Sequence, residues 1–560
     1  MKKVILLLFI AAISLTVHAI PARPGQWKLL TLKDGVTVNA ELQGDEFAHY
    51  WMSAEGTCYV ESKTPGIFEP TTLFWLQQQA AEKRQMRALM QRAKTRTVIG
   101  GEHEPYIGKK KGLILLVDFQ NKKFLEEHTH DLYNDILNKV GFSSDEGFKG
   151  SVKDYFLSQS YGQFELDFDV VGPLTMPKTY GYYGANTQNN DTNPGLMIAT
   201  ACEMADEFVN FKDYDWDGDG EVDQVFVLYA GLGEAAGGDV NTIWPHEWAL
   251  QGSDYGKTLT LDDVIIDTYA CGPELTKRGR SESTIGIDGI GTICHEFSHC
   301  LGLPDMYDTS SEKVRNYAMS NWDVMSSGSY NGGSFSPAAF TSYERMYCGW
   351  RQPVVLEKDV VVTDMKAIDD GGDFYIIYND AAPKEYYLLE NRQQKGWDEG
   401  VAGSGLLVLH VDFDEELWMY NLVNNTTSYD GYNSHQRCTI IPADNNFGNN
   451  DIATDVYPFN EKDSLTNNSL PRAELYNLNP DGIHYTSKPI SKIRMENGVI
   501  SFEFKNMVKG SPETAIKSAA IHQIQDSSEI YDLRGRSLGT DAGKLGKGVY
   551  IQGGKKIVRK

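Results

Sequence analysis

The chain has 560 residues and a formal net charge of −25, from 52 Lys and Arg against 77 Asp and Glu. This length predicts several domains, since one hydrophobic core seldom grows past about 300 residues. The hydrophobic content of 41% is ordinary for folded protein and excludes general disorder. The acidic surplus excludes a nucleic-acid-binding protein, which needs a basic surface. Seven cysteines are too few for a disulfide scaffold.

The N-terminus has the pattern of a secretory signal peptide. Lys2 and Lys3 precede an apolar run over residues 4–17, and Val17 and Ala19 are small residues at the cleavage positions. We therefore expect cleavage after Ala19, so that residues 1–19 are the signal peptide. The run is short for a membrane span and no second long apolar run follows, so we expect no transmembrane segment in the mature chain. The predicted location is secreted or at the cell surface.

Changes in composition divide the rest of the chain. Short alternating strands followed by a polar, basic helix at 77–96 predict a small unit over 20–106 that ends in an exposed joint, where a processing protease would cut. Strands predicted at the apolar runs 113–119 and 224–230 alternate with helical patterns, which predicts an α+β domain with a mixed sheet over 107–350. Residues 351–507 are predicted to be β-rich, and a polar linker over 508–520 leads to a β-like tail over 521–560. The strands expected in the β-rich part are 354–362, 374–378, 386–389 and 406–411.

The segment CHEFSHCLGLPDMYD, at 294–308, carries the ligand pattern of a zinc hydrolase. His295 and His299 are four residues apart, so on a helix they lie on one face, where both imidazoles can bind one zinc ion. Glu296 then lies beside the water that zinc activates and can act as its general base. This helix is the predicted active-site helix.

Residues after the helix extend the pattern. Gly302 can end the helix in a left-handed turn and return the chain towards the metal. Asp305 is then the expected third protein ligand, which leaves the fourth position open for water, and Asp308 remains an alternative. Met325 lies in a Gly/Ser-rich turn and matches the methionine turn of metzincin zinc peptidases. Most metzincins have histidine where this chain has Asp305.

Several stretches together resemble the immune inhibitor A family of secreted bacterial metallopeptidases. Besides the zinc motif they include SVKDY at 151–155, SYGQ at 160–163, IWPH at 243–246, WDVMSSG at 322–328 and YLLENR at 387–392. The resemblance covers about residues 107–450. It implies a metzincin-like zinc endopeptidase that acts on proteins or peptides. It also implies a latent precursor, in which 20–106 is a propeptide.

An acidic loop over 213–223 is a candidate calcium site. Its alternating carboxylates follow the first half of an EF-hand loop, where such groups converge on a hard cation. Phe226 stands where an EF-hand has its bidentate glutamate, so the loop is not an EF-hand. A solvated acidic turn is the alternative. The candidate ligands are Asp215, Asp217, Asp219, Glu221 and Asp223.

Cys58 is the one cysteine of the predicted propeptide. Its thiolate could occupy the open zinc position and hold the precursor latent. A small buried hydrophobe is the alternative. Cys294 and Cys300 flank the zinc motif, and the pairing of the cysteines stays open. Their candidate disulfide partners are Cys202, Cys271, Cys348 and Cys438.

The tail alternates strands with glycine turns, as in IYDLRGR at 530–536 and LGKGVYI at 545–551. It resembles the C-terminal sorting domain of the type IX secretion system, which implies outer-membrane secretion machinery as a partner. An ordinary terminal β-hairpin is the alternative.

The sequence as a whole predicts a secreted zinc endopeptidase made as a latent precursor, with zinc and calcium as cofactors. One competing hypothesis is a surface-displayed, calcium-stabilised binding module or adhesin with a relic peptidase core. Another is a metal-dependent hydrolase that acts on something other than peptides. His246 and Tyr330 could assist the oxyanion, but the sequence alone assigns them no role.

Overall fold

The computed structural model describes most of the chain from Ile20 onwards. The predicted signal peptide, most of the basic helix at 77–96 and the linker at 510–520 lie outside the described residues. None of the described helices is both long and apolar enough to cross a membrane. The described residues are 20–45, 47–64, 66–81, 83, 103–186, 191–278, 284–309, 316–426, 433–448, 451–509, 530–531, 548–552 and 555–559.

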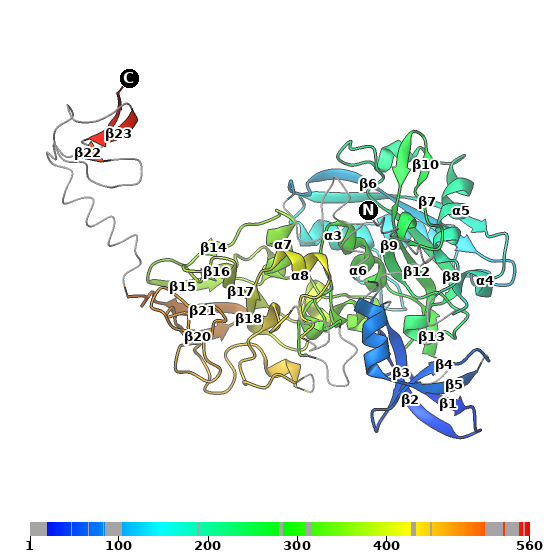
Figure 1. Ribbon diagram of the computed structural model, residues 1–560, viewed down its shortest axis with the longest axis horizontal. Helices are drawn as coiled ribbons and strands as arrows, with labels where there is room; N and C mark the ends of the chain where they lie inside the picture. Colours follow the sequence, from blue (N-terminus) through cyan, green and yellow to red (C-terminus); the bar gives the residue numbers. More distant parts are fainter. Residues whose placement is uncertain are drawn as a thin grey trace, which may run out of the picture.

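The N-terminal unit is a closed five-stranded barrel, drawn in blue in Figure 1. Neighbouring strands are antiparallel, and the first strand closes the barrel by pairing in parallel with the fifth. Leu30, Ala40, Tyr59 and Phe68 fill part of its interior. The strands are β1 (Trp27–Leu32), β2 (Thr37–Gly44), β3 (His49–Ser53), β4 (Cys58–Glu61) and β5 (Ile67–Thr71), and residues 73–81 are helical.

The central domain is built on a mixed sheet in the order β13-β12-β8-β6-β7, with β9 also paired to β12. The four long strands are parallel, and the two short strands beside β12 run antiparallel to it. A separate hairpin joins β10 (Leu259–Leu261) to β11 (Val264–Ile266). The strands of the sheet are β6 (Gly108–Asp118), β7 (Phe164–Thr175), β8 (Val225–Leu232), β9 (His246–Ala249), β12 (Thr268–Lys277) and β13 (Ile285–Ile287).

Successive side chains in the apolar part of β6 point to opposite faces of the sheet, and helices cover both faces. Ile114 and Leu116 pack into one core with the first group of helices, whereas Leu113, Leu115 and Val117 pack into a second core with the other group. Because both faces are buried, β6 is a continuous apolar run rather than an alternating one. The first group comprises α2 (His130–Asn138), α3 (Val152–Gln159) and α6 (Gly291–Cys300), and the second comprises α4 (Tyr180–Gly184) and α5 (Pro194–Ala205). The predicted mixed sheet is therefore present, in a layered α/β arrangement.

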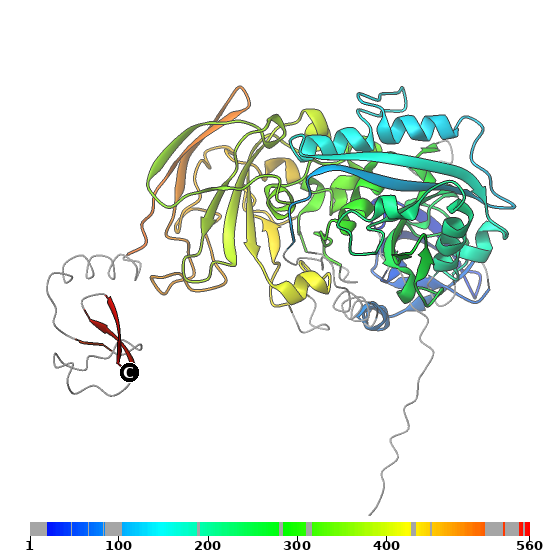
Figure 2. The same ribbon diagram turned by 90° about the horizontal axis from the view of Figure 1, so that it is seen from above.

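The β-rich domain lies against the central domain, as Figure 2 shows in yellow and orange. A five-stranded sheet, β14-β16-β17-β18-β19, packs on a three-stranded sheet, β15-β21-β20. Its strands are β14 (Val354–Val355), β15 (Val360–Met365), β16 (Tyr375–Tyr378), β17 (Glu385–Arg392), β18 (Gly405–Asp412), β19 (Cys438–Ile440), β20 (Ile490–Glu496) and β21 (Val499–Phe504). Two short helices, α7 (Ser342–Tyr347) and α8 (Glu415–Met419), lie between the domains.

The single strand predicted at 354–362 is wrong, because this stretch contributes to both sheets. β14 pairs with β16, whereas β15 pairs with β21. Between them, the carboxylate of Asp359 accepts a hydrogen bond from the backbone N–H of Asn506. The charged segment 357–359 therefore separates two strands that belong to different sheets.

The tail contains a small antiparallel sheet. It consists of β22 (Ile530–Tyr531), β23 (Gly548–Gln552) and β24 (Lys555–Arg559). The remainder of the predicted sorting domain lies outside the described residues.

A buried arginine on β17 ties the two large domains together. The Arg392 guanidinium donates to the carboxylates of Glu390 and Asp398 and to the backbone carbonyl oxygens of Trp322 and Ala339. Burial alone would lower the pKa of Arg392, but Asp398 and Glu390 raise it, so the side chain stays charged. Truncating one member of such a network leaves uncompensated buried charge.

We expect Arg392→Met to lower the free energy of unfolding by about 3–5 kcal/mol, since both carboxylates would lose their cation. Chemical denaturation followed by tryptophan fluorescence measures the loss. Arg351→Met is the matched control, because Arg351 pairs with the half-exposed carboxylate of Asp373 and should cost at most about 1 kcal/mol. Equal losses for the two variants would contradict the assignment.

Candidate metal centre

Helix α6 carries the zinc motif into the interior of the central domain. His295, Glu296 and His299 are all buried on it. Gly291 begins the helix where a Cβ atom would lie 1.9 Å from the carbonyl oxygen of Ser329, so only glycine fits at that position. The start of helix α6 thus packs closely against the backbone at Ser329.

The end of α6 is a Schellman motif, as the sequence predicts for Gly302. This glycine has φ +85°, its N–H donates to the carbonyl oxygen of His299, and the N–H of Leu303 donates to that of Ser298. The left-handed turn reverses the chain at once. Asp305 therefore returns to the face of the helix that bears the two histidines.

Backbone carbonyls hold both imidazole rings. His295 Nδ1 lies 2.7 Å from the carbonyl oxygen of Val324, and His299 Nδ1 lies 2.8 Å from that of Leu303. A carbonyl oxygen only accepts, so each Nδ1 carries the proton and each Nε2 presents a lone pair. This is the tautomer that a metal-binding histidine requires.

Three lone pairs converge in front of the helix. Asp305 Oδ1 lies 3.2 Å from His295 Nε2 and 3.4 Å from His299 Nε2. Three ligands arranged tetrahedrally about 2.0–2.1 Å from one zinc ion would be about 3.3 Å apart. The two nitrogens and one oxygen thus have both the spacing and the chemistry that zinc requires.

These same atoms have no hydrogen-bond partner among the described residues. His295 Nε2, His299 Nε2, Asp305 Oδ1 and Glu296 Oε2 are all buried and unsatisfied. Each such atom costs about 1–3 kcal/mol. Four of them in one place indicate that the site is built for a metal ion and a polar molecule beside it.

Asp308, the alternative third ligand, points elsewhere. Its carboxylate accepts a hydrogen bond from the backbone N–H of Asn316, 2.6 Å away. In the turn predicted to be a methionine turn, Met325 is buried and its carbonyl oxygen accepts a hydrogen bond from the N–H of Met306. The turn also supplies the Val324 carbonyl that holds His295, so it supports the centre through its backbone.

The charged groups of the centre have shifted pKa values. Burial raises the pKa of Glu296 to about 8, although His299 and the N–H of Ile20 oppose this shift. Burial alone would also raise the pKa of Asp305, but His299 and His295 hold it below its usual range. Positive charge in front of the helix, whether on the imidazoles or on a bound metal ion, keeps Asp305 ionised.

The start of the described chain lies in this site, which sequence analysis did not anticipate. The N–H of Ile20 donates to Glu296 Oε1 over 2.8 Å. The Trp244 indole donates to the carbonyl oxygen of Ile20, and the Tyr330 hydroxyl donates to that of Pro21. The N–H of Arg23 pairs with the carbonyl oxygen of Ala235. The only sequence signal for this segment is that it directly follows the predicted cut after Ala19.

His246, by contrast, is part of the structural core. Its Nδ1 lies 2.6 Å from the carbonyl oxygen of Trp244, and its Nε2 lies 3.1 Å from the hydroxyl of Tyr269. Burial lowers its pKa to about 3, so the ring is neutral. Its partners leave it no contact with the metal ligands.

The acidic loop brings together three of its five candidate carboxylates. Oxygens of Asp215, Asp217 and Asp223 lie within 4.8 Å of one another, whereas Asp219 and Glu221 are not part of that group. The Asp219 carboxylate accepts from the N–H of Glu221. The backbone of this loop is joined to β11, since the N–H of Val222 donates to the carbonyl oxygen of Ile265.

The cysteines lie in apolar surroundings. Cys58 is buried on β4 among Phe47, Tyr50, Leu76 and Ala80. The candidate disulfide partners are wrong, because each is a buried thiol whose pKa is raised by burial. They are Cys202, Cys271, Cys348 and Cys438.

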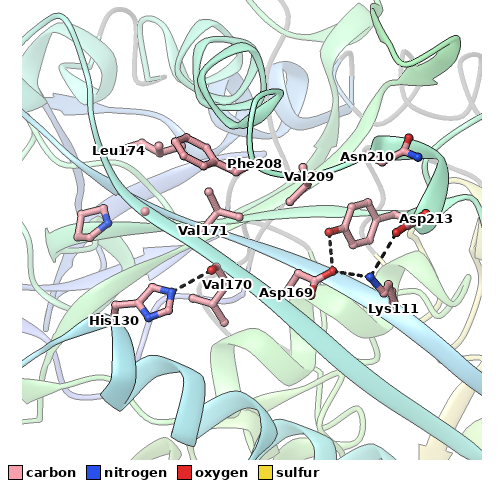
Figure 3. Close-up of a pocket in the computed structure, with 13 residues that line it drawn as sticks. Lys111, His130, Asp169, Val170, Val171, Leu174, Phe208, Val209, Asn210 and Asp213 are labelled. Atoms are coloured by element: carbon pink, nitrogen blue, oxygen red, sulfur yellow. Dashed lines mark hydrogen bonds and ion pairs between the residues drawn. The ribbon is translucent and has the colours of Figure 1, made fainter.

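The surface also has a hollow of about 660 Å³ that lies along β7. In Figure 3, Phe208 and Leu174 face each other at one end, and Lys111 bridges Asp169 and Asp213 at the other. Its lining contains none of the candidate metal ligands.

Comparison with known proteins finds similarity to metallopeptidases in the central domain. Residues 108–352 match the family described as immune inhibitor A peptidase M6, catalytic domain. The pre-pro-metalloprotease PrtV of Vibrio cholerae serotype O1 is 30% identical over 316 residues, which cover 47% of this chain and 33% of PrtV. Immune inhibitor A of Bacillus thuringiensis subsp. alesti is 27% identical over 286 residues, which cover 43% of this chain and 40% of that protein.

The chain thus spans between a third and two fifths of the length of these relatives. The matched region contains helix α6, its left-handed end and the methionine turn. Residues 108–352 thus resemble the catalytic domain of the immune inhibitor A family, peptidase M6.

Proposed function

We propose that the protein is a secreted zinc endopeptidase. The observation that carries this proposal is the group of four buried, unsatisfied atoms on His295, His299, Asp305 and Glu296. Zinc held by the first three residues would polarise the scissile carbonyl group and lower the pKa of a water molecule. The family of the central domain and the names of its relatives support peptide bonds as the target, rather than a relic core or another substrate.

Glu296 is the proposed general base. Its Oε2 is buried without a hydrogen-bond partner among the described residues, and a carboxylate oxygen of Glu296 lies within 4.8 Å of both histidine ligands, so the group can accept a proton from the attacking water. Its other oxygen accepts an N–H from a peptide chain, which is the geometry needed to return that proton to the leaving amine. The buried position, which raises the pKa of Glu296, suits a group that must both take and give a proton.

We expect Glu296→Ala to abolish cleavage of casein while leaving one zinc per chain, because Glu296 is not among the proposed ligands. Elemental analysis and a gel assay on the processed protein measure the two properties. His299→Ala is the comparison, since it should lose both zinc and activity. A carefully purified Glu296→Ala enzyme that still digests casein would rule out the mechanism.

We further propose that residues 20–106 keep the precursor latent, and that the contact of Ile20 with Glu296 is the means. Residues 20–23 lie where a substrate would have to bind, held by Trp244, Tyr330 and the backbone of Ala235. Signal-peptide cleavage after Ala19 would turn the N–H of Ile20 into an α-amino group, whose positive charge pairs better with the carboxylate. This assignment needs no thiol, so we prefer it to Cys58.

Removing residues 20–23 should therefore give a precursor that cleaves peptides before processing, at least tenfold faster than the chain that begins at Ile20. A quenched fluorescent peptide library measures the rate at early times. Cys58→Ser should remain latent, because Cys58 is buried between the barrel and the helix at 73–81. The opposite result, with an active Cys58→Ser precursor and a latent truncated one, would restore the thiol as the inhibitor.

We propose calcium as a second, structural ion at Asp215, Asp217 and Asp223. Converging carboxylates on a loop favour a hard cation with oxygen ligands. The ion would neutralise a loop that is joined to β11 and precedes β8. Asp219 and Glu221 are then outer residues of the same loop.

Calcium at millimolar concentration should raise the melting temperature of the wild-type chain by several degrees and leave Asp215→Asn/Asp223→Asn unchanged. Differential scanning fluorimetry with and without a chelator makes the comparison. Asp213→Asn is the control, since its carboxylate pairs with Lys111 and lies outside the group. A calcium shift that survives in the double variant would exclude this site.

The signal peptide and tail suggest the route of export. We propose that the chain leaves the cytoplasm through its signal peptide and then uses outer-membrane secretion machinery that recognises the tail. The antiparallel sheet of β22, β23 and β24 is compatible with a small sorting domain.

A further inference from the structure

The β-rich domain contributes one residue to the metal centre. Asn421 follows helix α8 and is completely buried. Its side-chain oxygen accepts a hydrogen bond from the N–H of Asp305 over 2.7 Å, and its Nδ2 donates to Asp305 Oδ2. The amide thus binds the same residue twice, once at its backbone and once at its carboxylate.

The two oxygens of Asp305 are divided between two partners. Oδ1 faces the Nε2 atoms of His295 and His299, whereas Oδ2 is taken by Asn421. A carboxylate with one oxygen held by a fixed donor can present only the other to a metal ion. The amide therefore selects which oxygen faces the histidines and fixes its direction.

Asn421 has a left-handed backbone conformation in which most side chains are strained. Asn421 has φ +55° and ends α8 in a Schellman motif, since its N–H donates to the carbonyl oxygen of Trp418 and that of Leu422 donates to Leu417. Glycine is the usual residue at this position, and asparagine is the side-chain-bearing residue that tolerates it best. Asparagine keeps the turn and adds an amide.

Neighbouring contacts hold the amide in place. The Thr309 hydroxyl donates to the carbonyl oxygen of Asn421. The Asn424 side chain donates to the carbonyl oxygens of Met306 and Cys438, so it joins the segment after Asp305 to β19. The loop after α8 is thus bonded to the metal-ligand segment at Asp305, Met306 and Thr309.

We propose that Asn421 is a positioning residue for the metal centre, which makes the centre a product of both domains. The proposal rests on the proposed zinc site. Asn421 lies beyond the region 108–352 that matches the family. The matched region therefore does not include the amide that orients Asp305, the proposed third ligand. Groups that orient a metal ligand typically change metal affinity by about 10–100-fold when they are removed.

Two substitutions distinguish the role of the Asn421 side-chain amide from that of its left-handed backbone turn. Asn421→Asp keeps the shape, the left-handed conformation and the acceptor for the N–H of Asp305, but it replaces the donor to Oδ2 with a second anion. Asn421→Gly keeps only the turn. Asn391→Ala is the matched control, because Asn391 is an equally buried amide that donates to the carbonyl oxygen of Met365, at the end of β15, and to that of Gly498, between β20 and β21.

The measurement is zinc affinity of the full chain beginning at Ile20, by competition with a chromophoric zinc chelator, alongside the melting temperature of the metal-free proteins. Both Asn421 variants should bind zinc about 10–100-fold more weakly, and without metal Asn421→Asp should melt below wild type, because it buries a second carboxylate beside that of Asp305. Asn391→Ala should lower the melting temperature and keep wild-type zinc affinity.

Wild-type zinc affinity in both Asn421 variants would overturn the positioning role and leave the proposed function intact. A wild-type chain that binds no zinc would overturn the proposed function and the positioning role together.

Discussion

The structure depends on two hydrogen bonds that commit the Nδ1 atoms of His295 and His299 to backbone carbonyls. They leave both Nε2 lone pairs in a buried site where no donor of the described residues meets them. Such an arrangement is costly unless a metal ion completes it, since a buried polar atom without a partner costs about 1–3 kcal/mol. The parts of the fold that supply these two carbonyls therefore act as parts of the metal centre.

Those parts come from separate regions of the chain. The methionine turn supplies the carbonyl of Val324, and the left-handed end of α6 supplies that of Leu303. Arg392 of the β-rich domain holds the carbonyl of Trp322, two residues before Val324. The two domains also share one hydrophobic core, in which Trp322 and Tyr343 pack with Leu388 and Trp418. The β-rich domain is thus a structural support of the site rather than an appended module.

Local patterns in the sequence predicted the features that local geometry decides. The four-residue spacing of the histidines predicted their shared face, and Gly302 predicted the left-handed turn, because both depend on residues within one helix and its end. The apolar runs at 113–119 and 224–230 predicted buried strands for the same reason. The prediction of a single strand at 354–362 was wrong, because the sequence pattern cannot show that the residues before and after a short polar segment pair in different sheets.

Contacts between distant residues could not be predicted. Ile20 and Glu296 are 276 positions apart, and Asn421 and Asp305 are 116 positions apart. Nothing in the composition of either segment identifies its partner, because such pairs are brought together only by the packing of whole domains. The cysteines show the same limit: their spacing allowed several disulfides, whereas the fold buries Cys202, Cys271, Cys348 and Cys438 as thiols.

The most direct test of the central claim is X-ray absorption spectroscopy at the zinc edge on the purified precursor. Two imidazole nitrogens and at least one carboxylate oxygen should surround the zinc at about 2.0–2.2 Å. No sulfur shell should appear, because Cys58 is buried between the barrel and the helix at 73–81, and no thiol belongs to a group of described residues that could hold a metal ion. A sulfur shell near 2.3 Å, or a spectrum with fewer than two imidazoles, would contradict the account.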